Sequence, residues 1–155
     1  MSFTNSNDYL TGRKPVVVGD NSQVNCVRYA VSLVAADLDA NDIGAVGILP
    51  AGCVPVAVYV DSDDLDTNGT PTIAASVGVL NATGDDLSTA TADGGAAWGT
   101  GLTVAQAGGQ VAVASKALAR VQAAAADRLI GVKFTAAAAT KAAGELGVTL
   151  LYRQV

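Results

Sequence analysis

The chain has 155 residues, a formal net charge of −5 and no histidine, and half of its residues are hydrophobic although only 5% are aromatic. This length suits one domain whose core is built mainly from small aliphatic side chains. The absence of histidine removes the commonest general base, and no phosphate loop, dinucleotide fingerprint or nucleophile elbow is present. We therefore predict that the protein is not an enzyme and uses no cofactor.

Polar or glycine residues interrupt every apolar run before it reaches the ~18 residues that a membrane helix needs. The N-terminal residues lack the basic and apolar regions of a signal peptide. We predict a soluble protein with no export signal and no membrane partner. Cys26 and Cys53 are too few for a disulfide scaffold or a zinc site, and we predict that both are small buried hydrophobes.

Charge is distributed unevenly along the chain. No Lys or Arg lies between Arg28 and Lys116, whereas this span holds ten of the fourteen acidic residues. Phosphates that approached the middle of the chain would meet only carboxylates, which argues against a nucleic-acid partner. The simplest interpretation is a solvated acidic surface that keeps the protein soluble.

Residues 1–14 are polar and aperiodic, which predicts an N-terminal arm followed by a single β-sandwich domain over residues 15–155. The arm carries three isolated large side chains and two cations, and we treat all five as candidates for contact with another subunit: Phe3, Tyr9, Leu10, Arg13 and Lys14. Because the arm has no periodicity of its own, our hypothesis is that it becomes ordered only against a neighbouring subunit or another partner.

Alternation of apolar and polar residues predicts strands along most of the remaining chain. In the first strand, from Val24, the residues Val27, Tyr29, Val31 and Leu33 point one way. In the strand that ends at Asp61, we expect Val54, Val56, Val58 and Val60 to share one face. The other expected strands cover residues 43–49, 72–80, 110–114, 128–135 and 146–153, and the Ala-rich residues 116–126 could form a short helix.

This pattern of about eight short strands, separated by turn signals, predicts an all-β protein with a jelly-roll-like β-sandwich. Ala74, Ser76 and Gly78 lie opposite the apolar face of the fourth expected strand, so a second layer can approach closely there. This flat face, together with the outward-pointing Ala57 and Tyr59, could contact a neighbouring subunit.

Residues 81–109 form a long, Gly-rich excursion with few large hydrophobes, a type of segment that is often functional or mobile. Its middle holds Trp98, the only tryptophan. Two interpretations stay open: Trp98 folds back and closes one end of the sandwich, or it anchors another chain as an interface residue. We favour the first slightly, since a lone tryptophan usually finds burial within its own fold.

The acidic segment DSDDLDTNGTPT, residues 61–72, resembles half of a calcium loop. Alternate oxygen-bearing residues before Gly69 could surround an ion, and the candidate ligands are Asp61, Asp63, Asp64, Asp66 and Asn68. The pattern then fails, because the twelfth position counted from Asp64 is Ala75 instead of a bidentate Glu. An Asn68-Gly69 turn between two strands explains the same residues and needs no missing ligand. We therefore predict a turn and no metal site.

A second acidic turn contains Asp85 and Asp86. Because one expected strand separates it from the first acidic turn, we predict that the two turns lie at opposite ends of the domain and do not form one site.

Three phrases carry a resemblance to a known family: DSDDLDTNGTPT at residues 61–72, ADGGAAW at 92–98 and LGVTLLYR at 146–153. They are similar to phrases in small proteins of tailed bacteriophages that are encoded beside the major capsid protein and serve as decoration, or cement, proteins. The resemblance runs from about Val24 to the C-terminus and includes no catalytic residues.

The resemblance implies a β-sandwich, made in the cytoplasm of the bacterial host, that binds the major capsid protein on the outside of an icosahedral head. It also implies a homo-oligomer, either a dimer or a trimer, that stabilises the shell of the virion. The alternative is a virion-surface or cell-surface sandwich that binds a glycan or receptor, with or without calcium. That alternative requires the first acidic turn and Trp98 to lie on one exposed face.

Overall fold

The computed structural model describes residues 2–20 and 23–155, and over these ranges it confirms the predicted all-β sandwich. The strands are β1 (Val24–Leu33), β2 (Ile43–Leu49), β3 (Cys53–Ser62), β4 (Ala74–Val79), β5 (Gly99–Leu102), β6 (Gly109–Val113), β7 (Arg128–Ala136) and β8 (Gly144–Gln154). Short helical turns connect some of them, namely η1 (Ala35–Asp37), η2 (Thr91–Asp93), η3 (Val104–Gln106) and α1 (Lys116–Ala119).

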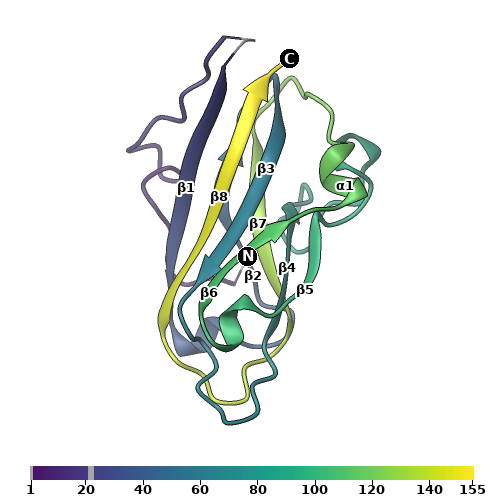
Figure 1. Cartoon of the computed structure of the whole chain (residues 1–155). Coiled ribbons are helices and arrows are strands. Elements are labelled where there is room, and N and C mark those ends of the chain that lie inside the picture. The colour runs from purple at the N-terminus through teal and green to yellow at the C-terminus, as the bar shows by residue number, and fades with distance from the viewer. Residues whose placement is uncertain (1, 21–22) are drawn as a thin grey trace.

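The strands form two four-stranded antiparallel sheets, one ordered β1-β8-β3-β6 and the other β2-β7-β4-β5. Each strand of the first half of the chain pairs with its counterpart of the second half, so that β1 pairs with β8, β2 with β7, β3 with β6 and β4 with β5. This is a jelly-roll-like arrangement of two layers. The first sheet lies at the front of Figure 1 and the second behind it.

Alternating side chains fill the space between the sheets, as the period of two predicts. From β1, Tyr29, Val31 and Leu33 are buried, while Cys26, Arg28 and Ser32 are exposed. From β7, Ile130, Val132 and Phe134 are buried. Burying a side chain of this size contributes roughly 1.5–3 kcal/mol, so these inward rows account for much of the stability.

One strand departs from the expected alternation. The pairing of β3 with β8 shifts register between Pro55 and Ala57, which is a β-bulge. The extra residue changes which side chains face inward. Val58 and Val60 are buried as predicted, but Val56 is 47% exposed, so the prediction that it shares their face is wrong.

The small residues of β4 are covered by the chain itself. A Cβ atom added to Gly78 would lie 3.3 Å from the Cα of Ala97, and Ser76 is only 5% exposed. The predicted close approach is therefore real, but the approaching layer is the excursion and not a neighbouring subunit. The excursion itself is structured, because it contributes β5, which pairs with β4.

Two further observations complete the fold. Cys53 is buried as predicted, but Cys26 is exposed on the outer face of β1, so the prediction of its burial is wrong. In the described ranges, every helix is too short to cross a lipid bilayer.

Candidate interaction surfaces

The acidic segment after β3 does not gather its carboxylates around one point. Asp63 Oδ2 accepts a hydrogen bond from the backbone N–H of Glu145 at 2.7 Å, and Asp64 Oδ1 accepts one from Asp66 N–H at 3.1 Å. Asn68 Oδ1 accepts from Thr70 N–H at 2.9 Å, as an Asx turn requires. Each of these three side chains accepts from a different backbone donor, and this supports the turn interpretation of the segment.

Asp66 is the structural centre of this turn. Its side chain is 1% exposed, and its two oxygens accept hydrogen bonds from the backbone N–H groups of Thr72, Ile73, Ala139 and Thr140. Burial by itself would raise the pKa of Asp66, but the four donors outweigh it and hold the pKa well below its usual range. The carboxylate thus joins the β3–β4 connection to the β7–β8 connection.

Asp61 takes part in a separate cluster on the outer face of the front sheet. The Arg28 guanidinium donates to Asp61 Oδ1 from Nε at 3.1 Å and to Glu145 Oε1 from Nη2 at 2.8 Å. Hydrogen bonds with Asp61 and then Glu145 are the main causes that raise the pKa of Arg28 above its ordinary value. The three residues come from β1, β3 and β8, and they form a charged band beside an apolar area.

The second acidic turn lies at the other end of the domain, as predicted. Asp85 accepts hydrogen bonds from Asn81 and Thr83, and Asp86 pairs with Lys133 Nζ at 2.9 Å. In Figure 1 the β3–β4 connection forms the lower tip, whereas the segment that follows β4 lies beside α1 in the upper part. The two acidic turns cannot form one site.

The N-terminal arm closes one open side of the sandwich. Asn7 Nδ2 donates to the carbonyl of Ala30 in β1 at 3.1 Å and to that of Val46 in β2 at 2.7 Å. Asn5 Nδ2 donates to Ser32 O at 2.8 Å. Both β1 and β2 are edge strands of their sheets, so the arm occupies backbone acceptors that would otherwise face solvent.

The large side chains of the arm contact the same domain. The ring of Phe3 lies 5.9 Å from that of Phe134, and Tyr9 meets Tyr29 edge-on at 4.9 Å. Leu10 joins a small cluster beside β2. The hypothesis that the arm is ordered only against another chain is therefore wrong, because its anchors are already engaged within this one.

The two cations of the arm stay at the surface. Arg13 lies 3.8 Å from Asp8, with both side chains largely exposed, and the Lys14 ammonium lies over the Tyr9 ring at 5.3 Å. Contacts this exposed contribute little to stability.

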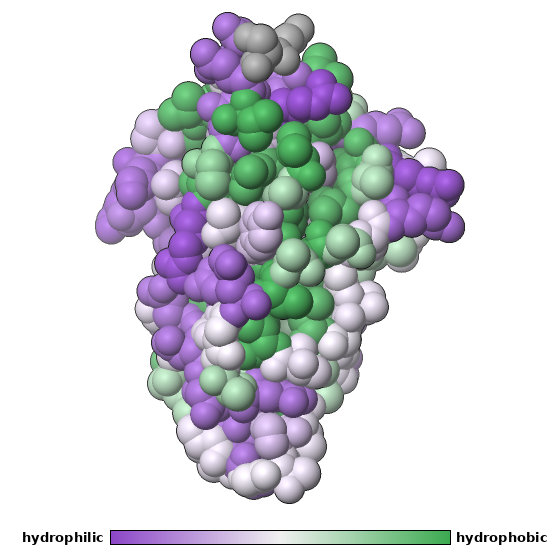
Figure 2. All heavy atoms as spheres, in the orientation of Figure 1, coloured by the Kyte–Doolittle hydropathy of each residue, from purple (hydrophilic) through white to green (hydrophobic). Residues whose placement is uncertain are grey.

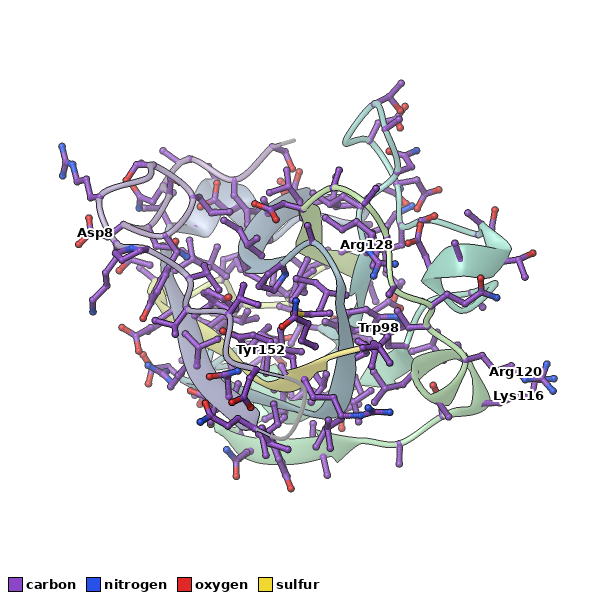
Figure 3. The ribbon with its side chains drawn as sticks, turned by 90° about the horizontal axis from the view of Figure 1, so that it is seen from above. Asp8, Trp98, Lys116, Arg120, Arg128 and Tyr152 are labelled. Atoms are coloured by element: carbon purple, nitrogen blue, oxygen red, sulfur yellow. The ribbon has the colours of Figure 1, made fainter. Side chains whose placement is uncertain are left out.

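Trp98 is fully buried, so of the two interpretations the closing of the sandwich end is confirmed. Its Nε1–H donates to the carbonyl of Asp93 at 3.1 Å, and the Asp93 carboxylate pairs with Arg128 at 2.9 Å. Arg128 also donates to the carbonyls of Ala92, Cys53 and Gln122. Figure 3 shows Trp98 and Arg128 directed into the body of the molecule from the excursion and β7. Trp98 cannot serve as an exposed interface anchor in this arrangement.

Tyr59 and Ala57 lie on the outer face of β3, as predicted, beside an apolar groove. Two adjoining grooves lie beside α1: one of about 450 Å³ between β3, the end of β8 and the residues that follow α1, and one of about 380 Å³ between β3, β6 and α1. We call them together the α1 groove, and its main lining residues are Pro55, Val56, Ala57, Tyr59, Ala112 and Ala119. Figure 2 shows hydrophobic atoms gathered over the upper and middle part of this face, with hydrophilic atoms on both sides.

Val56 was predicted to face inward because it lies two residues from Val54 and Val58 in a period-two pattern. Pro55 in mid-strand was the available signal, since proline in a sheet is confined to edges and bulges.

The polar side chains of these surfaces are engaged mainly with one another and with the backbone. Within residues 2–20 and 23–155, no group of three or more His, Cys, Asp or Glu side chains is placed to hold a metal ion. The three most strongly perturbed ionisable groups are engaged in structural contacts. Asp66 holds its turn and Arg28 forms ion pairs, while burial raises the pKa of Tyr29, whose hydroxyl donates to Ile48 O at 2.7 Å. The described part of the chain is thus a β-sandwich of two sheets with a polar acidic tip and an apolar groove on one face.

Chains similar to this one occur in solved structures of bacteriophage capsids. The chain is similar to a chain of the capsid of Ralstonia phage GP4, with 34% sequence identity, a TM-score of 0.77 and coverage of 97% of both chains. It also shares its fold with a chain of the cyanophage Pam1 capsid asymmetric unit, at 24% identity and a TM-score of 0.65, with 92% of this chain and 94% of that chain covered. No protein-family model and no curated protein matches it.

The identity to the GP4 chain extends over nearly the whole length of both proteins. The chain therefore belongs to a family of bacteriophage capsid proteins that includes this component of the GP4 capsid.

Proposed function

We propose that the protein is a head-decoration protein, which binds the major capsid protein on the outside of the phage shell and stabilises the virion. The observation that carries the proposal is the 34% identity over 97% of both chains with a component of the Ralstonia phage GP4 capsid. The resemblance of the acidic segment, the ADGGAAW phrase and the last strand to decoration proteins supports the same role.

The construction of the domain suits such a role. Its connections are held by polar contacts, the buried ones of Asp66 and the partly buried Arg128–Asp93 pair, so the sandwich presents preformed surfaces. A preformed surface loses little conformational entropy on binding. A ligand that binds an assembled shell and not its dissociated subunits stabilises the shell by mass action. No catalytic group is needed for this effect.

The alternative, a glycan-binding or receptor-binding sandwich, loses its main requirement. It needs Trp98 and the first acidic turn on one exposed face. Trp98 is buried, however, and its indole N–H donates to the backbone carbonyl of Asp93. An aromatic platform for a sugar ring is therefore not available from this residue.

The test is direct binding to heads of the same phage from which the protein has been removed. We expect saturable, stoichiometric binding measured by cosedimentation, together with a higher melting temperature of the heads. Absence of binding to such heads would contradict the proposal, and closed shells formed by this chain alone would identify it as the shell subunit instead. Light scattering of the free protein would measure the homo-oligomer, for which we propose a dimer or trimer.

A further inference from the structure

The turn at Asn68 and Gly69 places a reactive pair of groups at the tip of the sandwich. It belongs to the connection between β3 and β4, which forms the lower tip in Figure 1. An asparagine side chain is open to attack by the backbone nitrogen of the next residue, and asparagine is a thermolabile residue for this reason. A glycine in the next position lacks the Cβ atom that hinders this attack. Of the seven asparagines in the chain, only Asn68 is followed by glycine.

The attacking nitrogen, that of Gly69, is free to move. Within residues 2–20 and 23–155, its N–H donates no hydrogen bond. Residues 67–70 are all exposed, and a Cβ atom added to Gly69 would meet nothing within 4 Å. The turn therefore has room to bring the Gly69 nitrogen onto the side chain of Asn68.

The side-chain amide of Asn68 is placed for this attack. Its Oδ1 accepts a hydrogen bond from Thr70 N–H at 2.9 Å, which folds the side chain back over the backbone of its own turn. The same donor draws electron density from Cγ and stabilises the oxyanion that forms when Cγ is attacked. The leaving nitrogen, Nδ2, is held only by the exposed hydroxyl of Thr140, at 2.9 Å.

A second pair of the same type shows the opposite arrangement. Asp93 and Gly94, in the excursion, could form the same cyclic imide by loss of water. The Asp93 carboxylate, however, pairs with Arg128 at 2.9 Å. The Gly94 N–H donates to Thr91 O at 3.1 Å, and Gly94 is packed against the backbone of Ala117. The fold thus holds both reacting groups of this pair in place, whereas it leaves those of the Asn68 turn free.

We propose that Asn68 is a site of spontaneous modification, at which the side-chain amide becomes a carboxylate through a succinimide. The Gly69 nitrogen loses its proton to hydroxide and forms a bond with Cγ of Asn68. The Cγ–Nδ2 bond then breaks, and the amide nitrogen takes a proton from water and leaves as ammonia. A second water molecule opens the ring at either carbonyl, which gives aspartate or isoaspartate at position 68. No oxidant or reductant takes part.

The reaction changes the surface of the tip and leaves its anchor in place. It adds one negative charge to a formal net charge of −5 and removes the amide donor to Thr140 Oγ1. The four backbone N–H groups that hold Asp66 are not involved. The modified protein therefore stays folded and differs in the charge and outline of its tip. This inference does not depend on the proposed function, because the chemistry needs only the folded chain and water.

Incubation of the full-length folded protein in mildly alkaline buffer tests the proposal. We expect an acidic form to accumulate on anion exchange, and peptide mass spectrometry to place the amide-to-acid mass change at position 68. The product should be a mixture of aspartate and isoaspartate, and residue 93 should contain no isoaspartate in the same sample. A synthetic peptide of residues 64–72 is the positive control for the conditions.

Gly69→Ala is the matched variant. The backbone conformation of Gly69 is one that other residues adopt, and the added methyl group meets open space, so the turn should fold as before. The methyl group hinders the approach of the nitrogen to Cγ, and we expect conversion at position 68 to slow about tenfold or more.

Three results would overturn the proposal. The first is retention of the amide at position 68 in the folded chain while the peptide converts. The second is equal conversion rates in the natural protein and Gly69→Ala. The third is faster conversion at another asparagine, or isoaspartate at residue 93, because either would show that the contacts described above do not select the reacting pair.

Discussion

The buried carboxylate of Asp66 accepts a hydrogen bond from the backbone N–H of Thr140 at 2.8 Å, although 74 residues separate the two in the chain. The same carboxylate accepts from Ala139, Ile73 and Thr72. One ionised side chain therefore satisfies four backbone donors at the tip of the sandwich, where two long connections meet.

Replacing Asp66 with Asn should lower the free energy of unfolding at pH 7 by about 3 kcal/mol or more. The amide keeps a single acceptor oxygen and places its own N–H₂ against backbone donors, which leaves buried groups unpaired. Urea denaturation measures the loss. Asp64→Asn is the control, because Asp64 is exposed and accepts one local hydrogen bond. Equal losses in both variants would contradict the structural role of Asp66.

The stability of the natural protein and that of Asp66→Asn should respond differently to pH. The pKa of folded Asp66 lies below the unfolded value of about 3.9, so its contribution is fully present above that pH. The contribution is lost as the pH falls through the folded-state pKa. We expect the stability difference between the natural protein and Asp66→Asn to be constant from neutral pH to about pH 5 and to narrow below pH 4. A stability difference that grows on acidification would show that folding raises the pKa of Asp66 instead of lowering it.

Calcium should not change the melting temperature of the protein. The oxygens of Asp63, Asp64 and Asp66 each accept from a different backbone donor, so an ion would have to displace these contacts. Calorimetry with calcium and with chelator is a sensitive check, because a ligand at about 100 times its dissociation constant stabilises by about 2.7 kcal/mol. A saturable rise in melting temperature that Asp64→Ala abolishes would restore the metal interpretation.

Asn7 should contribute to the stability of the isolated chain, because it donates to both edge strands at once. Asn7→Ala removes the donors to Ala30 O and Val46 O, and we expect a loss of about 1–2 kcal/mol in urea denaturation. Ser6→Ala, an exposed neighbour, should change little. Matching values for the two variants would mean that the arm is detached in solution.

Trp98→Ala should cost roughly 3–5 kcal/mol of stability, since it opens a cavity beneath the excursion. Trp98→Phe keeps most of the apolar contact, loses the hydrogen bond to Asp93, and should cost less. Chemical denaturation separates the two. A Trp98→Ala protein with natural stability and weakened head binding would indicate that Trp98 is an interface residue after all.

The bulge in β3 can be tested by replacing Val58 and Val56, two residues apart in the strand, with alanine. Val58 is 1% exposed, so Val58→Ala should lose on the order of 1–3 kcal/mol. Val56→Ala should stay within about 0.5 kcal/mol of the natural protein, because its side chain faces solvent. Thermal unfolding of both variants gives the comparison, and a larger cost at Val56 would place it inside the core.

Local pattern determined the class of the fold. The alternation in residues such as Tyr29, Val31 and Leu33 on β1, or Ile130, Val132 and Phe134 on β7, follows from the geometry of a strand with one buried face, and it needs no knowledge of the partner strand. Turn chemistry is equally local, which is why Asn68-Gly69 was correctly interpreted as a turn. Burial of the single tryptophan was the better of two open alternatives for a similar reason, because a large apolar ring gains most inside its own domain.

Tertiary structure alone decided the remaining features, because each depends on residues far apart in the chain. The bulge that exposes Val56 arises from pairing between β3 and β8. Pro55 is a local signal of an irregular strand, but only the partner strand decides which side chain turns outward. The arm is ordered because β1 and β2 leave their edge carbonyls side by side for Asn7, a consequence of the sheet order. The α1 groove exists because β8, β3 and α1 bring Arg153, Val56 and Ala119 together, and only the folded chain makes them neighbours.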